Sequence, residues 1–232
     1  MPLGDTPYVY LGGQADTKRL FYSDPDKALA KPITIPGGYG VIKAGTVMGI
    51  ITESTSRKNY YVPYVFADTT GMIAALAADD ARGLAYLVAD EGGASADAYV
   101  TMDDSYKFAV GDHLQAQDSD YATQTDCGAI TAIDRTTYLH MAKITVTNTI
   151  GVLQTSKGAS ISIQTAAASP YVKGTGILKA SVDTGTGENA KGGQGVLVLK
   201  NAMLYVNNLY CYNADALTDL SSASADGKYL IM

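Results

Sequence analysis

The chain has 232 residues, of which 47% are hydrophobic and 17% are charged, with a formal net charge of −6. This length is enough for one large domain or two small ones with a buried core, and the low charge with 24 glycines favours β-structure with short turns. The acidic balance and the scattered basic residues argue against nucleic-acid binding, which needs clustered Lys and Arg. The closest basic pairs, Lys18–Arg19 and Arg57–Lys58, are interpreted as surface charges.

Targeting and cysteine patterns bear on where the protein works. The first residues lack a basic region followed by an apolar one, so we expect no signal peptide. No apolar run reaches membrane-spanning length, so we expect no membrane partner. Cys127 and Cys211 have no CxxC spacing, and we expect two buried small hydrophobic side chains, with a disulfide left open. We expect the protein to be made in the cytoplasm and kept or assembled there.

Residues 1–30 are polar, with a turn at 24–26, and they predict an extended N-terminal arm. A free tail is normally poor in aromatic residues. This arm has four, which indicates that it lies against its own domain or a neighbouring chain. These aromatic residues are Tyr8, Tyr10, Phe21 and Tyr22.

Residues 31–150 predict a β-barrel-like or β-tulip-like domain, because short alternating segments are separated by Gly and Asp turns. The expected strands lie in residues 32–36, 41–42, 46–52, 60–66, 84–89, 98–102, 108–114, 128–134 and 139–147. Pro63 confines its strand to a sheet edge or a bulge. One short helix is expected over residues 68–82, with Met72, Ile73 and Leu76 on one face.

Residues 151–232 predict a second, smaller β region, which either stands apart or packs as one unit with the preceding domain. Its expected strands lie in residues 159–164, 176–182, 196–206 and 228–232. A glycine-rich loop covers residues 183–195. The apolar end of the chain is expected to dock as an edge strand, with an interface contact as the alternative. The fold class is therefore mainly β.

Patterns that carry chemistry are largely missing from the sequence. His113 and His140 have no partner at metal-ligand spacing, and no GxSxG elbow is present. The loop from Gly185 to Gly193 lacks the order of a phosphate-binding loop. The acidic pairs do not match a calcium-binding loop. We therefore expect no catalytic, cofactor-binding or metal-binding residues, and no enzyme.

Tyrosine is the informative aromatic residue, with 17 Tyr, 3 Phe and no Trp. Tyrosine suits protein interfaces, since it combines a large contact area with a hydroxyl that tolerates partial exposure. The alternative is that the tyrosines simply follow their strand propensity. The interface candidates are the four aromatic residues of the arm together with Tyr60, Tyr61 and Tyr64.

Several segments resemble the decoration proteins of tailed-phage heads. The segment from Pro32 to Gly49 resembles their opening, in which a strand leads to a KxGTVL motif and then to a second strand. The segment from Ala81 to Asp90 is similar to their xxGxLxxD strand. Residues 108–112 and 128–134 resemble strand corners of phage virion β-barrel proteins. Together the resemblance covers residues 32–147, and the C-terminal third and the expected helix depart from it.

The resemblance implies a decoration, or cement, protein on the capsid surface of a virion, made in the host cytoplasm. Its implied partners are the major capsid protein and further copies of itself, with a trimer favoured over a dimer; it implies no nucleic acid, membrane or cofactor. One alternative is another virion β-protein, such as a head-fibre base, tail-tube or baseplate component. A different class is a carbohydrate-binding or glycan-processing β-protein, against which the lack of Trp counts.

Overall fold

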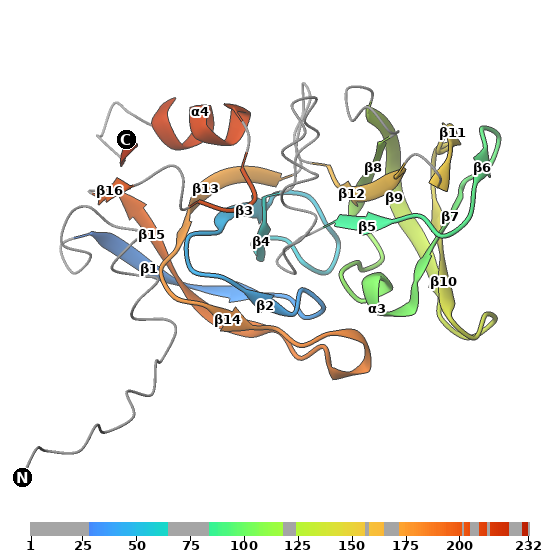
Figure 1. The fold of residues 1–232 in the computed structure, drawn as a ribbon, viewed down its shortest axis with the longest axis horizontal. Coiled ribbons are helices and arrows are strands. Elements are labelled where there is room, and N and C mark those ends of the chain that lie inside the picture. Colours follow the sequence, from blue (N-terminus) through green and yellow to red (C-terminus); the bar gives the residue numbers. More distant parts are fainter. Residues whose placement is uncertain are drawn as a thin grey trace, which may run out of the picture.

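The computed structural model shows a mainly β protein, whose two principal sheets lie side by side (Figure 1). It describes residues 28–64, 84–117, 124–155, 158–164, 172–200, 202–204, 209–212, 214–222 and 229–231. Within these ranges, none of the helices has the length and apolar character needed to cross a membrane.

The first principal sheet joins the two ends of the described chain. It contains β1 (Leu29–Ile35), β15 (Gly193–Lys200), β13 (Val172–Leu178), β3 (Val47–Ile51) and β4 (Tyr61–Pro63), in that order. Every neighbouring pair is antiparallel. Because β1 pairs with β15, strands that end by residue 63 and strands that begin at residue 172 or later form a single sheet.

Both edge strands of this sheet contain a proline, Pro32 in β1 and Pro63 in β4. Proline has no backbone N–H to donate to a ladder, so it is tolerated where one side of the strand is unpaired. The edge position of β4 confirms the prediction made from Pro63. The two edges approach each other, and the Lys31 amine bridges them by donating to the hydroxyl of Tyr61.

The second principal sheet is a nearly closed barrel. It contains β5 (Leu84–Tyr86), β12 (Ser160–Ile163), β8 (His113–Gln117), β9 (Gln124–Asp134), β10 (Met141–Val146) and β7 (Asp97–Thr101), in that order. The end strands β5 and β7 meet through a bridge between Leu87 and Val100. The Val88 N–H also donates to the Tyr99 carbonyl at 2.9 Å. Closure leaves little free sheet edge, which protects the barrel from unwanted pairing.

Short elements complete the described fold. The small ladders pair β2 (Val41–Ile42) with β14 (Val182–Asp183), β6 (Glu91–Gly92) with β11 (Val152–Leu153), and β16 (Ala202–Leu204) with β17 (Tyr229–Ile231). The helices are α3 (Met102–Ser105), α4 (Ala214–Ser222) and the single 3₁₀ turn η3 (Gly187–Asn189).

Apolar side chains from both sheets form one continuous core. Strand β10 shows why: its buried residues, Ala142, Ile144 and Val146, alternate with more accessible ones, as the two-residue period of a strand requires. Strand β13 contributes Ile177 and Leu178, both fully buried, to the same cluster. The two sheets are therefore packed together and do not stand as isolated units.

Strand pairing does not follow the expected division at residue 150. β12 lies beyond that boundary yet belongs to the barrel, whereas β13 and β15 complete the first sheet. The C-terminal β17 pairs parallel with β16, so the end of the chain docks as a strand as predicted. Of the expected arm over residues 1–30, residues 1–27 lie outside the described residues, as does the expected helix over 68–82. Leu29 and Ala30, expected in the arm, belong to β1, because they pair with β15.

Helices α3 and α4 are findings that the sequence patterns did not predict. α4 packs on β13 through Ala216 and Leu220, which are buried, and its Asp219 accepts a hydrogen bond from the N–H of Gly174 at 3.1 Å. Its apolar residues Ala216, Leu217 and Leu220 lie at helical spacing and pack in or against the core. A helix of nine residues is marginal by itself, so tertiary packing stabilises it.

Gly176 in β13 allows a test of packing in the first sheet, with Gly92 in β6 as its control. A methyl group on Gly176 would overlap the carbonyl oxygen of Val198, whereas one on Gly92 would meet no atom within 4 Å. We expect Gly176→Ala to lower the free energy of unfolding by about 1–3 kcal/mol. Gly92→Ala should change it by less than about 0.5 kcal/mol. Urea unfolding measures both, and equal midpoints would contradict this account of β13.

Candidate functional site

The described tyrosines predicted for an interface occupy two different environments. Tyr60 is 37% exposed, so it stays available for contact with another molecule. Tyr61 and Tyr64 are only 5% and 2% exposed, so their expected place on a surface is wrong. Both rings pack into the core that β4 shares with the rest of its sheet. The remaining candidates, Tyr8, Tyr10, Phe21 and Tyr22, lie outside the described residues.

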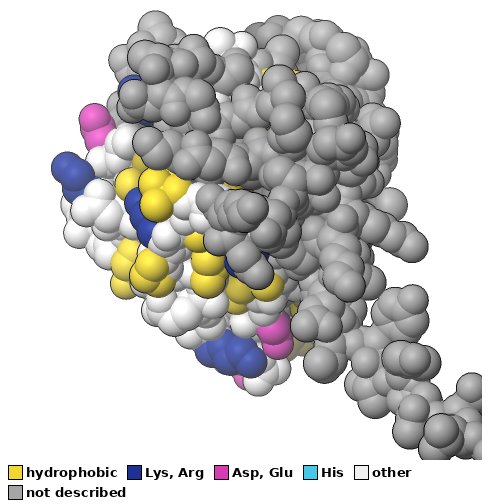
Figure 2. All heavy atoms as spheres, turned by 90° about the vertical axis from the view of Figure 1, so that its left-hand side faces the viewer, with side chains coloured by type: hydrophobic (Ala, Val, Ile, Leu, Met, Phe, Trp, Pro, Cys, Tyr) yellow, Lys and Arg dark blue, Asp and Glu magenta, His cyan; other side chains and the backbone are white. Residues whose placement is uncertain are grey.

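Tyr60 borders a surface groove where the two edges of the first sheet approach each other. Thr34 and Ile35 of β1 form one wall, and Lys191 and Gln194 line the groove beyond them. On the side of the molecule that carries β1 and β15, Figure 2 shows hydrophobic side chains in small groups among basic side chains, a few acidic ones and other, uncharged atoms. Such a mixed surface suits a protein contact better than a single charged ligand.

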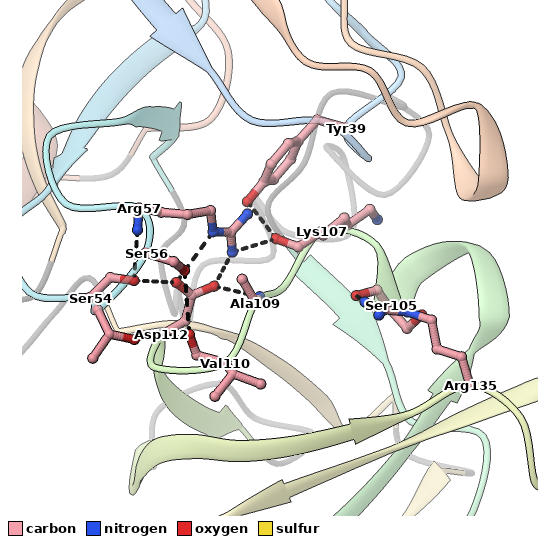
Figure 3. Close-up of polar contacts among 11 residues, drawn as sticks. Tyr39, Ser54, Ser56, Arg57, Ser105, Lys107, Ala109, Val110, Asp112 and Arg135 are labelled. Carbon is pink, nitrogen blue, oxygen red and sulfur yellow. Dashed lines mark hydrogen bonds and ion pairs between the residues drawn. The ribbon is translucent and has the colours of Figure 1, made fainter.

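A buried ion pair joins the loops of the two sheets (Figure 3). Asp112 precedes β8 of the barrel and its side chain is fully buried. The Arg57 guanidinium, on the loop between β3 and β4, donates to both oxygens of this carboxylate. The Ser54 hydroxyl donates to Asp112 Oδ1 at 3.0 Å, and the Ala109 N–H donates to Oδ2 at 2.9 Å. The carboxylate therefore has several donors in place of water.

Tyr39 adds a third segment to this junction, from the turn between β1 and β2. The Tyr39 hydroxyl and the Arg57 guanidinium both donate to the carbonyl of Lys107, each at 3.0 Å. Burial raises the pKa of Tyr39 above its usual value, and the positive charge of Arg57 opposes this shift. Burial also lowers the pKa of Arg57, because its charged form loses water. The junction is thus a buried, hydrogen-bonded contact.

No pattern in the sequence points to this junction. The prediction that Arg57 is a surface charge is wrong, since the residue is only 7% exposed. One signal in the sequence could have indicated a buried carboxylate: Asp112 follows Gly111 in a turn between two apolar segments. A carboxylate buried there needs a cationic partner. Nothing local identifies Arg57 as that partner, because the two residues meet only when the sheets pack together.

A polar ladder crosses one face of the barrel at β8 and β12. Gln115 and Gln117 face Ser162 and Ser160 across the ladder, and all four are buried. The Ser162 hydroxyl accepts from the side-chain amides of Gln115 at 3.1 Å and Gln117 at 3.2 Å. A shift of one residue would turn these amides into the apolar interior. The ladder therefore specifies the register of β8 against β12.

Of the acidic pairs in the sequence, Asp90–Glu91 and Asp103–Asp104 fall on described residues. Asp104 pairs with Lys107 at 2.6 Å, while Asp90 accepts from the N–H and hydroxyl of Thr155. His140 lies on the exposed hairpin between β9 and β10, and His113 lies in β8. Across the ranges that the structure describes, no three His, Cys, Asp or Glu side chains converge as metal ligands.

Comparison with known proteins identifies no relative of this chain. No family model, curated protein or solved structure matches it.

The buried ion pair predicts unequal effects for two lysine and arginine replacements. Arg57→Met leaves Asp112 buried and uncompensated, and should lower the free energy of unfolding by about 3–5 kcal/mol. Lys191→Met removes an exposed pair with Asp183 and should cost less than about 1 kcal/mol. The double variant Arg57→Met/Asp112→Asn removes the stranded charge and should recover part of the loss. Similar urea midpoints for the two single variants would show that the ion pair does not hold the sheets.

Cys127 predicts a loss of stability in alkali. Both cysteines are buried, as expected from the sequence, and they form no disulfide with each other. Burial raises the pKa of Cys127 to about 12. The folded state keeps this thiol neutral, and the resulting contribution to the free energy of unfolding is complete below the thiol's usual pKa near 9. That contribution is lost as the pH rises from 9 towards 12, because ionisation then favours the unfolded chain. We expect about 2 kcal/mol to be lost by about pH 10.5. Urea unfolding of Cys127→Ala should show a shallower decline; an equal decline would exclude this thiol.

Proposed function

We propose that this protein is a structural virion protein that binds the outside of a tailed-phage capsid and bridges neighbouring capsomers. The observation that carries the proposal is that the segments which resemble decoration proteins supply strands of both principal sheets. The segment from Pro32 to Gly49 supplies the C-terminal part of β1, all of β2 and the first residues of β3. The described part of the second segment forms β5, and residues 128–134 lie in β9. The resembling segments therefore contribute to both principal sheets.

The buried contacts between the two sheets support a clamping role. A protein that bridges two capsomers must resist deformation when the shell is loaded from within. The resembling corner at residues 108–112 ends in Asp112, whose ion pair with Arg57 ties the barrel to the first sheet. Separating the sheets would expose this pair and the shared core, so the two sheets resist movement apart.

The partners in this proposal are the major capsid protein and other copies of the chain, with a trimer as the favoured assembly. Repeated copies on one shell give avidity, so each contact needs only modest affinity. Binding to the closed shell alone stabilises that state, by about 2.7 kcal/mol per site at about 100 times the Kd.

Co-sedimentation with empty heads tests this proposal. The full chain is mixed with heads assembled from the major capsid protein of the same phage, and bound copies are counted after pelleting. We expect saturable binding and a higher temperature of head disruption, with a trimer in light scattering. Absence from the pellet at micromolar concentrations, together with binding to tail tubes or to polysaccharide, would favour one of the other functions.

A further inference from the structure

Two short segments, residues 90–95 and 150–155, form a clasp at one end of the barrel (Figure 1). They contain β6 and β11, which pair through two residues on each strand. Opposite residues of an antiparallel pair point to the same face, so Glu91 shares a face with Leu153. Leu153 belongs to the hydrophobic core, and Glu91 is itself only 7% exposed. An acidic side chain therefore occupies a core-facing position of the clasp.

The carboxyl group of Glu91 has little to stabilise a negative charge. Within the described part of the chain it forms no ion pair, and residues 150–155 include no charged side chain. A hydrogen bond with the Ser95 hydroxyl favours the charged form. That hydroxyl has a single proton, however, and the carbonyl of Asp97 also accepts it at 3.2 Å. A neutral Glu91 can instead donate to Ser95 Oγ, so protonation removes this competition.

The charges on neighbouring strands also favour the neutral form of Glu91. Burial raises the pKa of Glu91 above its usual value near 4.5, and the negative charge of Asp97 adds to this shift. The nearby cation, Lys143 of β10, pairs with Asp97 at 3.6 Å. Tyr99 of β7 also lies near both carboxyl groups, and a hydrogen bond with Tyr138 raises the pKa of Tyr99 to about 12. The phenol therefore stays neutral in acidic and neutral solution.

The adjacent residue Asp90 closes the clasp and responds to pH in the opposite sense. The hydroxyl and the N–H of Thr155 donate to its carboxylate and hold the pKa of Asp90 below its usual value near 3.8. The contribution of ionised Asp90 to stability is complete above pH 3.8 and is lost as the pH falls through the lowered pKa. The contribution of neutral Glu91 is complete below pH 4.5 and is lost as the pH rises through the raised pKa. The clasp should therefore hold most firmly between these two values.

We propose that the clasp is a pH-sensitive element of the barrel, which stays closed in mildly acidic solution and opens locally more often in neutral solution, where Glu91 is ionised. Opening exposes Leu153 and frees backbone groups of β6 and β11. The protonation of one buried carboxyl group thus controls whether this end of the barrel offers unpaired strand edges. The clasp works in this way whether or not the protein binds a capsid, because all its parts belong to one chain.

Amide hydrogen exchange of the full chain, followed by NMR between about pH 4.5 and about pH 7.5, tests the clasp. The reporter is the N–H of Ile150, which donates to the carbonyl of Ser95 at 2.9 Å. The N–H of Leu87, which donates to the carbonyl of Ala159 at 2.9 Å, is the control within the barrel. After correction for intrinsic exchange, protection of Ile150 should fall with rising pH by at most about tenfold per pH unit, since one proton is lost. Protection of Leu87 should stay constant.

Two matched variants assign this fall in protection to Glu91. Glu91→Gln is neutral at every pH, so the protection of Ile150 should stay high and independent of pH. Glu188→Gln makes the same chemical change at an exposed residue of η3 and should behave like the wild type.

Constant protection of Ile150 in the wild type would overturn the proposal, as would the wild-type pH dependence in Glu91→Gln. Loss of the pH dependence in Glu188→Gln would overturn it too, because the effect would not be specific to Glu91. An equal fall for Leu87 would show that the whole barrel loosens, and the clasp would then have no separate response.

Discussion

The fully buried carboxylate of Asp112 and the guanidinium of Arg57 form the contact on which the arrangement of the two sheets depends. Each charge lies on a loop of a different sheet, and each would be buried without compensation if the other moved away. Ser54 and the Ala109 N–H complete the shell of the carboxylate, and Tyr39 shares the Lys107 carbonyl with the guanidinium. One relative orientation of the sheets satisfies all of these groups at once.

Edge protection is the second constraint on this fold. The barrel closes through Leu87 and Val100, and the first sheet places a proline in each of its edge strands. Because proline cannot donate to a ladder, these edges do not complete a barrel by strand pairing, and Lys31 spans them with its side chain. The fold therefore offers loops and hairpin tips to other molecules, in place of open strand edges.

This organisation fits a protein that works by surface contact. The junction joins the two sheets, and the β9–β10 hairpin carries the exposed Leu139. Tyr60 lies beside a separate groove at the gap between β1 and β4. The proposed bridging between subunits of a shell requires contact points that lie far apart on one body. Each point can then bind its subunit without changing the structure around the others.

Local sequence determined the mainly β class, the position of strands such as β2 and β10, the edge placement of β4 and the burial of both cysteines. These follow from period-two alternation, turn residues and the missing N–H of proline, which act over a few residues. Only the tertiary structure decided that β1 pairs with β15, that α4 forms on β13, that Tyr61 and Tyr64 are core residues, and that Asp112 meets Arg57. Each of these depends on which distant segments become neighbours, and the residues carry no local mark of that choice.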